Sequence, residues 1–318
     1  MVLYELVQTI RSYINKPIKQ HKLLKNKDLW NQLCSSMDVI EDTELAIESF
    51  VNREFKEDFG ILYLAVYGLL QALFLQQDAT KHLNESLGYG NIEFSNFPDL
   101  QTVRNTRNDA IGHPTKRSYG KPLSYHYISR ATLSYKGFQL LSFYSDGSHQ
   151  FKDIDISKCI ADQNTGIRSI LTSIIDKLKK EENEHKQKFK NEKLEDCFPQ
   201  IVHYYFEKIY ESISNFEKYP PNFGLVHLNL IRKSIEDFQK VLAKRDIDWE
   251  TYPDIKNTCG DIEYPFSKLE EFLNSIKDGK PTNINGKDAV IFWENSRQHF
   301  NELIQIIREI DEEYAQLQ

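Results

Sequence analysis

Apolar residues recur at helical spacing along most of the chain. This periodicity predicts an amphipathic helix over residues 2–14 and further helices over 29–37 and 42–55. Residues 56–87 predict a long central helix that is apolar nearly all round in its first half and polar at its end. Such a helix is expected to be the buried spine of a helical bundle. The basic run over 16–27 is expected to be a connector.

The most apolar part of the central helix, residues 60–75, stops at Gln76-Gln77-Asp78. A membrane-spanning helix needs about 20 apolar residues, so this stretch is interpreted as a helix of a bundle, and no membrane association is expected. The amino terminus mixes charged side chains among its apolar ones, unlike a signal peptide. The four cysteines form no close pair. These features favour a cytoplasmic protein.

Beyond residue 113 the helical pattern gives way to short runs rich in Tyr, Phe, Ser and Ile. Strands are predicted over residues 123–128, 132–135, 139–144 and 149–154, and Ser145-Asp146-Gly147-Ser148 predicts a hairpin turn. A small antiparallel β-sheet is therefore expected as an insertion at about residues 122–155.

Helical periodicity returns at about Ser157 and continues to Lys190, with Gly166 as a candidate break. The very highly charged stretch over 177–193 favours a domain boundary. The prediction is a mainly α protein, with a helical domain and its β insertion over 1–190 and a separate helical domain over 195–318. The role of the second domain is not indicated by its sequence. Its predicted helices cover 195–216, 224–243, 263–276 and 287–314.

The stretch Arg107-Asn108-Asp109-Ala110-Ile111-Gly112-His113 places a permanent cation, an amide and an imidazole at the end of a helix predicted over 98–111. Arg107 falls on the apolar face of that helix. A guanidinium in such a place needs an anion or a satisfied polar partner. A glycine and a proline flank His113 and predict that the helix ends there. This end would let imidazole and guanidinium converge on one phosphate.

Arg-Asn, four residues and then His resembles the signature of HEPN domains. These are helical-bundle proteins, many of which are metal-independent endoribonucleases of bacterial toxin, phage-defence and RNA-processing systems. The apolar central helix fits the same resemblance, which covers residues 42–115. It implies an HEPN-like bundle that needs no cofactor and has Arg107, Asn108 and His113 as catalytic residues. It also implies a homodimer, in which two motifs face one cleft with the apolar helix faces at the seam.

In the reaction that the resemblance implies, His113 would transfer protons, Arg107 would stabilise the charge on the phosphorane and Asn108 would position its neighbours. The product would be an RNA end with a 2′,3′-cyclic phosphate. Some HEPN toxins carry a tyrosine two residues after the histidine, which a partner nucleotidyltransferase modifies. This chain has Thr115 there, so we expect no such modification. The inserted sheet and the second domain are candidates for recognising an antitoxin, a defence partner or RNA.

Charge is distributed unevenly along the chain. The whole protein carries −7, whereas residues 101–137 contain seven basic side chains and a single acidic one. Four tyrosines, at positions 119, 125, 127 and 135, are interleaved with this charge. Cations and aromatic rings suit single-stranded RNA, through phosphate neutralisation and base stacking. We therefore expect Arg104, Lys116 and Arg117 to bind RNA. Equally, the tyrosines could cover a core while the lysines face water.

Other interpretations of the same residues stay open. Arg107 could be a surface side chain, with His113 merely ending a helix, and the protein could be a non-catalytic module that binds RNA or another protein. Gln76, Gln77 and Asp78 are expected to mark where the central helix leaves the core, although they could line the Arg107 pocket. The other histidines form no ligand cluster, so no metal site is expected.

Overall fold

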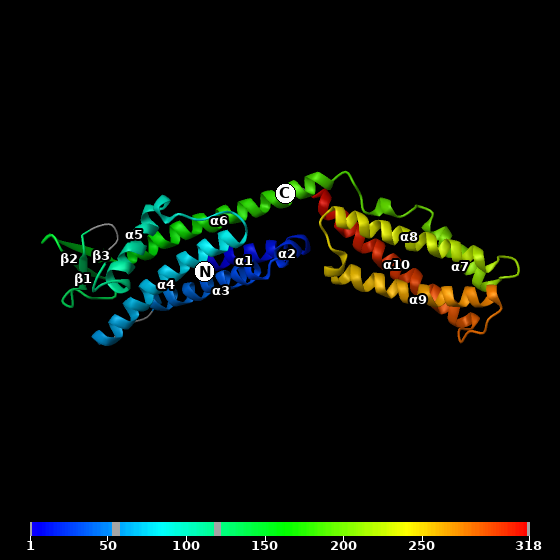
Figure 1. Cartoon of the computed structure of the whole chain (residues 1–318), viewed down its shortest axis with the longest axis horizontal. Coiled ribbons are helices and arrows are strands. Elements are labelled where there is room, and N and C mark those ends of the chain that lie inside the picture. Colours follow the sequence, from blue (N-terminus) through cyan, green and yellow to red (C-terminus); the bar gives the residue numbers. More distant parts are fainter. Residues whose placement is uncertain (1, 53–57, 118–121, 317–318) are drawn as a thin grey trace. The chain divides into compact units, whose positions relative to one another are not determined.

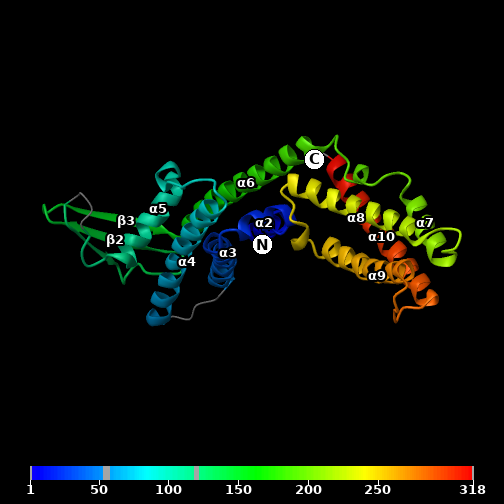
Figure 2. The ribbon, with the colours of Figure 1, turned by 45° about the vertical axis from the view of Figure 1, so that its right-hand side comes forward.

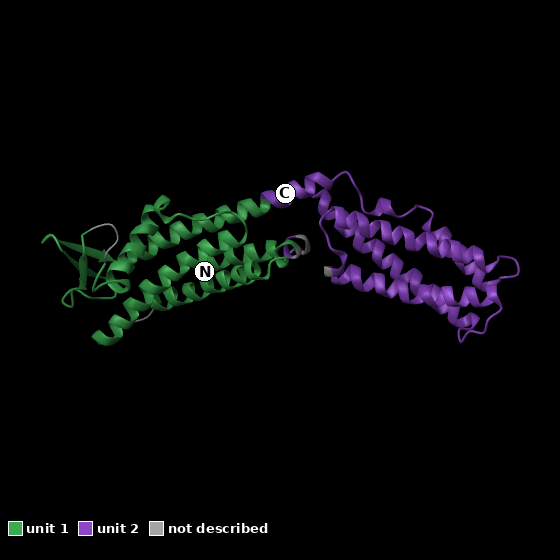
Figure 3. Ribbon diagram, in the orientation of Figure 1, with its two compact units in different colours: residues 1–15, 22–179 green, residues 16–21, 180–318 purple. Residues whose placement is uncertain are grey.

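The computed structural model describes residues 2–52, 58–117 and 122–316. These residues are mainly helical, and the chain divides into two compact units (Figure 3). Unit 1 comprises residues 1–15 and 22–179, and unit 2 comprises 16–21 and 180–318. The division lies ten residues or more before the predicted boundary at 190–195. It falls inside one helix, α6 (Ile156–Phe189), which contributes to both units.

Unit 1 is a helical bundle with a small sheet beside α5 and the beginning of α6 (Figures 1 and 2). Its first helix, α1, has the predicted bounds Val2–Ile14. The expected connector over 16–27 instead contains a second helix, α2 (Pro17–Leu24), most of which belongs to unit 2. The remaining helices are α3 (Lys27–Asn52), α4 (Phe59–Ser86), α5 (Pro98–Arg107) and the first part of α6.

The two helices predicted over 29–37 and 42–55 are one continuous helix, α3. The acidic side chains at the expected break bind Arg11 of α1, with Arg11 Nη2 2.6 Å from Asp38 Oδ1 and 3.1 Å from Glu41 Oε2. Polar residues at this point therefore serve a helix–helix contact rather than a loop. The predicted end of the second helix, at Phe55, lies outside the described residues.

The burial of α4 is the reverse of the prediction. Its apolar first half is largely exposed, and Leu64 has 75% of its surface accessible. Its more polar second half is buried, and Gln76 and Gln77 are completely inaccessible. The helix was expected to leave the core at Gln76. It instead continues, largely buried, to Ser86. By length and composition alone, α4 is long and apolar enough to cross a membrane. In its most apolar stretch of 18 residues, 33% is buried within the protein.

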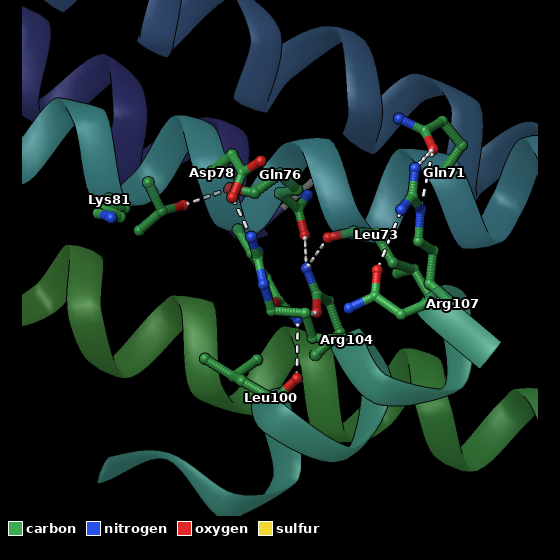
Figure 4. Close-up of polar contacts among 12 residues, drawn as sticks. Gln71, Leu73, Gln76, Asp78, Lys81, Leu100, Arg104 and Arg107 are labelled. Atoms are coloured by element: carbon green, nitrogen blue, oxygen red, sulfur yellow. Dashed lines mark hydrogen bonds and ion pairs between the residues drawn. The ribbon is translucent and has the colours of Figure 1, made fainter. Parts of the chain in front are cut away.

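A buried network of amides joins α4 to its neighbours (Figure 4). Gln163 of α6 donates to Leu73 O and Gln76 Oε1, at 2.9 and 3.0 Å, and accepts from Gln77 Nε2 at 2.8 Å. Gln77 Nε2 also donates to the carbonyl of Leu100 in α5. Since buried amides are costly unless paired, this network fixes α5 and α6 against α4.

Helix α6 is unbroken at Gly166, contrary to the expected break. A Cβ at this position would lie 2.6 Å from Leu100 Cγ. The glycine therefore allows α5 to approach α6 closely, and this contact positions the helix that carries Arg107.

The sheet has the order β1-β2-β3, with both pairs antiparallel, and comprises β1 (Ser124–Ile128), β2 (Gly137–Tyr144) and β3 (His149–Asp155). The predicted hairpin between β2 and β3 is confirmed, with Gly147 at a φ of 84°. The run over 132–135 is not a strand but a turn, in which Gly137 N donates to the Ser134 hydroxyl. The inner face of the sheet packs over α5 and the start of α6, in a core that includes Phe138 and Leu140.

Unit 2 is a bundle of four helices around a single apolar core, joined by the end of α6. Helix α7 packs against α8 and α10, and α9 packs against the same two helices. Helix α9 begins at Pro253, ten residues before the predicted start at 263, and Pro265 is accommodated within it. The bounds are α7 (Val202–Ser214), α8 (Pro221–Lys244), α9 (Pro253–Asp278) and α10 (Gly286–Ala315).

Candidate functional site

Arg107 is the last residue of α5, and its half-buried side chain points toward α4 (Figure 4). Its Nε and Nη2 donate to Gln71 Oε1 at 3.1 and 2.8 Å, and its Nη1 donates to Asn108 Oδ1 at 3.0 Å. The guanidinium carbon lies 4.2 Å from the centroid of the Phe74 ring. Burial and the neighbouring charge of Arg104 lower the pKa of Arg107, but a guanidinium remains charged at neutral pH.

The partners of Arg107 are neutral acceptors. Among the described residues, no carboxylate forms an ion pair with it, in contrast to Arg104, whose Nη1 lies 2.8 Å from Asp78 Oδ1 (Figure 4). An arginine held by neutral groups keeps a whole positive charge for a ligand, whereas an arginine paired with a carboxylate is largely neutralised. The side chain is therefore fixed in place by neutral groups, and Asp78 acts on its charge only from a distance.

The helix ends in a π turn over Asn108–Gly112. The backbone N–H of His113 donates to the carbonyl of Asn108 at 2.8 Å, five residues back. Turns of this kind are rare and often occur at functional sites. The wider turn brings Gly112 against the Arg107 side chain, because a Cβ on Gly112 would lie 2.6 Å from Arg107 Nη1.

His113 follows this turn directly and is exposed. The residue before it, Gly112, thus lies against the Arg107 guanidinium. Within the described part of the chain, no hydrogen bond or ion pair engages the His113 ring, so neither ring nitrogen is occupied by a partner. Asn108 is half-buried and is fixed through its Oδ1, which accepts from Arg107.

The side chains predicted to bind RNA differ in their surroundings. Arg104 is paired with Asp78, and Arg117 Nη1 is paired with Asp109 Oδ1. Lys116 is exposed and has no ion pair among the described residues. Two of the three cations are therefore partly compensated within the protein. Tyr119, interleaved with them in the sequence, lies outside the described residues.

Gln71 was not predicted as a site residue. Of the three residues at 76–78, only Asp78 comes near the site, through Arg104, while Gln76 and Gln77 belong to the buried amide network. The signal for Gln71 is present in the sequence as a single amide within an otherwise apolar stretch of α4. The sequence does not show how α4 is rotated about its axis, and this rotation turns the Gln71 amide toward α5.

The outer face of the sheet exposes aromatic rings from all three strands. This aromatic face is formed by Tyr125, Tyr127, Phe143, His149 and Phe151. The rings contact one another, with centroids 5.9 Å apart for Tyr127 and Phe143 and 5.3 Å apart for His149 and Phe151. These tyrosines therefore face outward instead of covering the core, which lies on the opposite face.

The described residues contain no group of three or more His, Cys, Asp or Glu side chains placed to hold a metal ion. In comparisons with family models, with curated proteins and with solved structures, no match to this chain was found.

Proposed function

We propose that this protein is a metal-independent endoribonuclease of the HEPN type, acting on single-stranded RNA in a toxin or phage-defence setting. The observation that carries the proposal is the arrangement of Arg107. Its guanidinium is held by neutral acceptors on Gln71 and Asn108, without a carboxylate in contact, and lies against Gly112, which precedes the exposed His113. This arrangement offers one fixed cation and one proton-transfer group to a phosphodiester.

The proposed reaction is an internal transesterification. A neutral imidazole of His113 removes the proton from a ribose 2′-hydroxyl, and the 2′-oxygen forms a bond to phosphorus. Arg107 stabilises the added negative charge of the phosphorane through its planar fork of donors. The bond from phosphorus to the 5′-oxygen breaks, and the leaving oxygen takes a proton from an imidazolium. The products are a 2′,3′-cyclic phosphate and a 5′-hydroxyl.

A single imidazole cannot readily serve both the entering and the leaving oxygen, because they lie on opposite sides of the phosphorus in an in-line displacement. We therefore propose a homodimer that supplies a second His113. The exposed apolar side chains of α4 support this, because Ile61, Leu64 and Leu75 share one face of the helix with Gln71, at successive intervals of three, seven and four residues. Such a stripe would seat two α4 helices against each other beside Arg107.

The test is incubation of the purified protein with labelled single-stranded RNA in EDTA. The wild-type protein is expected to produce fragments with 2′,3′-cyclic phosphate ends, and RNA with 2′-O-methyl groups is expected to stay intact. His113→Ala should abolish cleavage. His82→Ala, which removes an exposed imidazole from α4, should cleave at the wild-type rate. Full activity of His113→Ala would refute the assignment.

A second candidate function is a non-catalytic module that binds RNA or another protein. The aromatic face of the sheet favours it, because exposed rings on adjacent strands offer a surface on which unpaired bases stack. In the same assay this candidate gives a mobility shift without fragments. Phe143→Ala would then weaken RNA binding, whereas His113→Ala would leave it unchanged.

A further inference from the structure

A cavity of about 350 Å³ lies between the inner face of the sheet and the end of α5. This sheet cavity is lined by residues from α5, the π turn and all three strands. Its volume is at the lower end of the range of small-molecule sites, which is about 300–1,000 Å³. Asp109, in the π turn, is the member of the lining that belongs to the Arg107–His113 stretch.

His126 of β1 lies in the wall of the sheet cavity and is 5% exposed. Its Nδ1 lies 2.8 Å from the hydroxyl of Ser142, and its Nε2 lies 3.0 Å from the hydroxyl of Ser124. Burial and the nearby charge of Arg117 lower the pKa of His126. The cavity thus contains a neutral imidazole between two hydroxyl groups that can donate or accept hydrogen bonds.

Three charged side chains also line the sheet cavity, and two of them are cations. Arg117 Nη1 pairs with Asp109 Oδ1, and the same carboxylate oxygen lies 3.6 Å from His126 Nε2. Lys152 of β3 lines the cavity and has no ion pair among the described residues. With Asp109 compensated by Arg117, the ammonium of Lys152 is left without a counter-charge.

We propose that the sheet cavity binds a phosphate group. Lys152 supplies the uncompensated positive charge, the Arg117 guanidinium adds N–H donors, and the serine hydroxyl that accepts from the His126 N–H donates its own proton to a phosphate oxygen. Such a set of cations and hydroxyls suits an anion that has several acceptor oxygens. The phosphate belongs either to a free mononucleotide or to the terminus of an RNA strand. This site is distinct from Arg107 and His113, and the proposal does not depend on RNA cleavage.

The proposal is tested by following the His126 ring by NMR during pH titrations. A bound phosphate places negative charge near the imidazole, so saturating uridine 5′-monophosphate should raise the pKa of His126 by about one unit. Uridine, which lacks the phosphate, should leave it unchanged. The same titration distinguishes a free ligand from an RNA end. It is repeated with inorganic phosphate and with a 2′-O-methyl tetranucleotide that either carries or lacks a 5′-phosphate.

Lys152→Gln should weaken uridine 5′-monophosphate binding about tenfold, because it removes one charge-assisted hydrogen bond. Lys158→Gln is the matched control, since Lys158 is an exposed lysine outside the cavity, and it should bind as tightly as the wild type. Three outcomes would overturn the proposal. The His126 pKa could shift equally with uridine, it could show no saturable shift with any phosphate, or Lys152→Gln could bind uridine 5′-monophosphate as tightly as the wild type. His113→Ala should retain phosphate binding, so failure of the nuclease proposal remains distinguishable.

Discussion

Arg107 occupies the space that a side chain on Gly112 would need: its Nη1 lies 2.6 Å from the position of a Cβ there. A second atom of the site, Asn108 Oδ1, lies 3.4 Å from the same position. The glycine is therefore required by the guanidinium rather than by backbone conformation, since the φ of Gly112 is not positive. This relationship ties the helix end to the placement of the cation.

Gly112→Ala is expected to displace the Arg107 guanidinium while leaving the fold intact, because the clashing atom is the far end of a flexible side chain. RNA cleavage should fall roughly 100-fold through loss of alignment, and the free energy of unfolding should change by about 1 kcal/mol or less. Cleavage rates and urea denaturation measure the two effects. Gly260→Ala, in α9, has no atom within 4 Å of the new Cβ and should leave cleavage unchanged.

The sequence was sufficient for features that depend on local pattern. The bounds of α1, the central helix, the insertion of a sheet and its hairpin turn all follow from periodicity and turn residues. The division of α3 was wrong because the partner of Asp38 and Glu41 is Arg11, about 30 residues away. No local pattern indicates such a contact.

The candidate site was only partly predictable for a related reason. Arg107 and His113 could be selected from their spacing, but Gln71 depends on how α4 is rotated against α5. The reversed burial of α4 was missed because hydropathy indicates which side chains avoid water, not whether a neighbour within this chain covers them. The lining of the sheet cavity could not be predicted because it depends on the register of β1 with β2, which aligns His126 with Ser142.

Gln71→Glu is expected to weaken RNA binding without weakening the fold. It would place a carboxylate at the amide oxygen that lies 2.8 and 3.1 Å from Arg107 Nη2 and Nε. The new ion pair would neutralise the guanidinium, so RNA affinity measured by fluorescence anisotropy should fall about tenfold. Gln71→Ala removes the acceptor but adds no charge, so its affinity should fall less. Wild-type affinity in Gln71→Glu would mean that Arg107 does not contact RNA.

The buried His126 is expected to make stability depend on pH. Its pKa is lowered in the folded state by burial and by Arg117, so below about pH 6.5 the unfolded chain binds a proton that the folded protein does not. The free energy of unfolding should therefore fall as pH decreases from about 6.5 toward the folded-state pKa. The slope contributed by this residue is at most about 1.4 kcal/mol per pH unit.

Denaturation of the wild type and His126→Gln at several pH values measures this contribution. The variant should lose stability less steeply between pH 6.5 and 5, because it has no imidazole to protonate at that position. Equal slopes for the two proteins would mean that His126 is protonated as readily in the folded protein as in the unfolded chain.

Unit 2 contains a buried ion pair whose two members should differ in their effect on stability. The Arg245 side chain is inaccessible, and its Nη1 lies 3.8 Å from Asp311 Oδ1. Asp311 also accepts from the backbone N–H groups of Leu194 and Glu195, at 2.9 and 3.0 Å. Removing Asp311 leaves a buried cation without its counter-ion, whereas removing Arg245 leaves a carboxylate that two amides still solvate.

Asp311→Ala is therefore expected to lower the free energy of unfolding by about 3–5 kcal/mol, and Arg245→Met by clearly less. The double variant should be more stable than Asp311→Ala alone, since no unpaired charge remains. Urea denaturation followed by tryptophan fluorescence reports on this unit through Trp249 and Trp293 once Trp30 of unit 1 is replaced by phenylalanine. Glu195→Ala breaks an exposed ion pair, in which Arg308 Nη2 lies 2.7 Å from Glu195 Oε1. It should lower the free energy of unfolding by less than about 1 kcal/mol. A larger loss for Glu195→Ala than for Asp311→Ala would show that pair distance, not burial, determines the cost in this bundle.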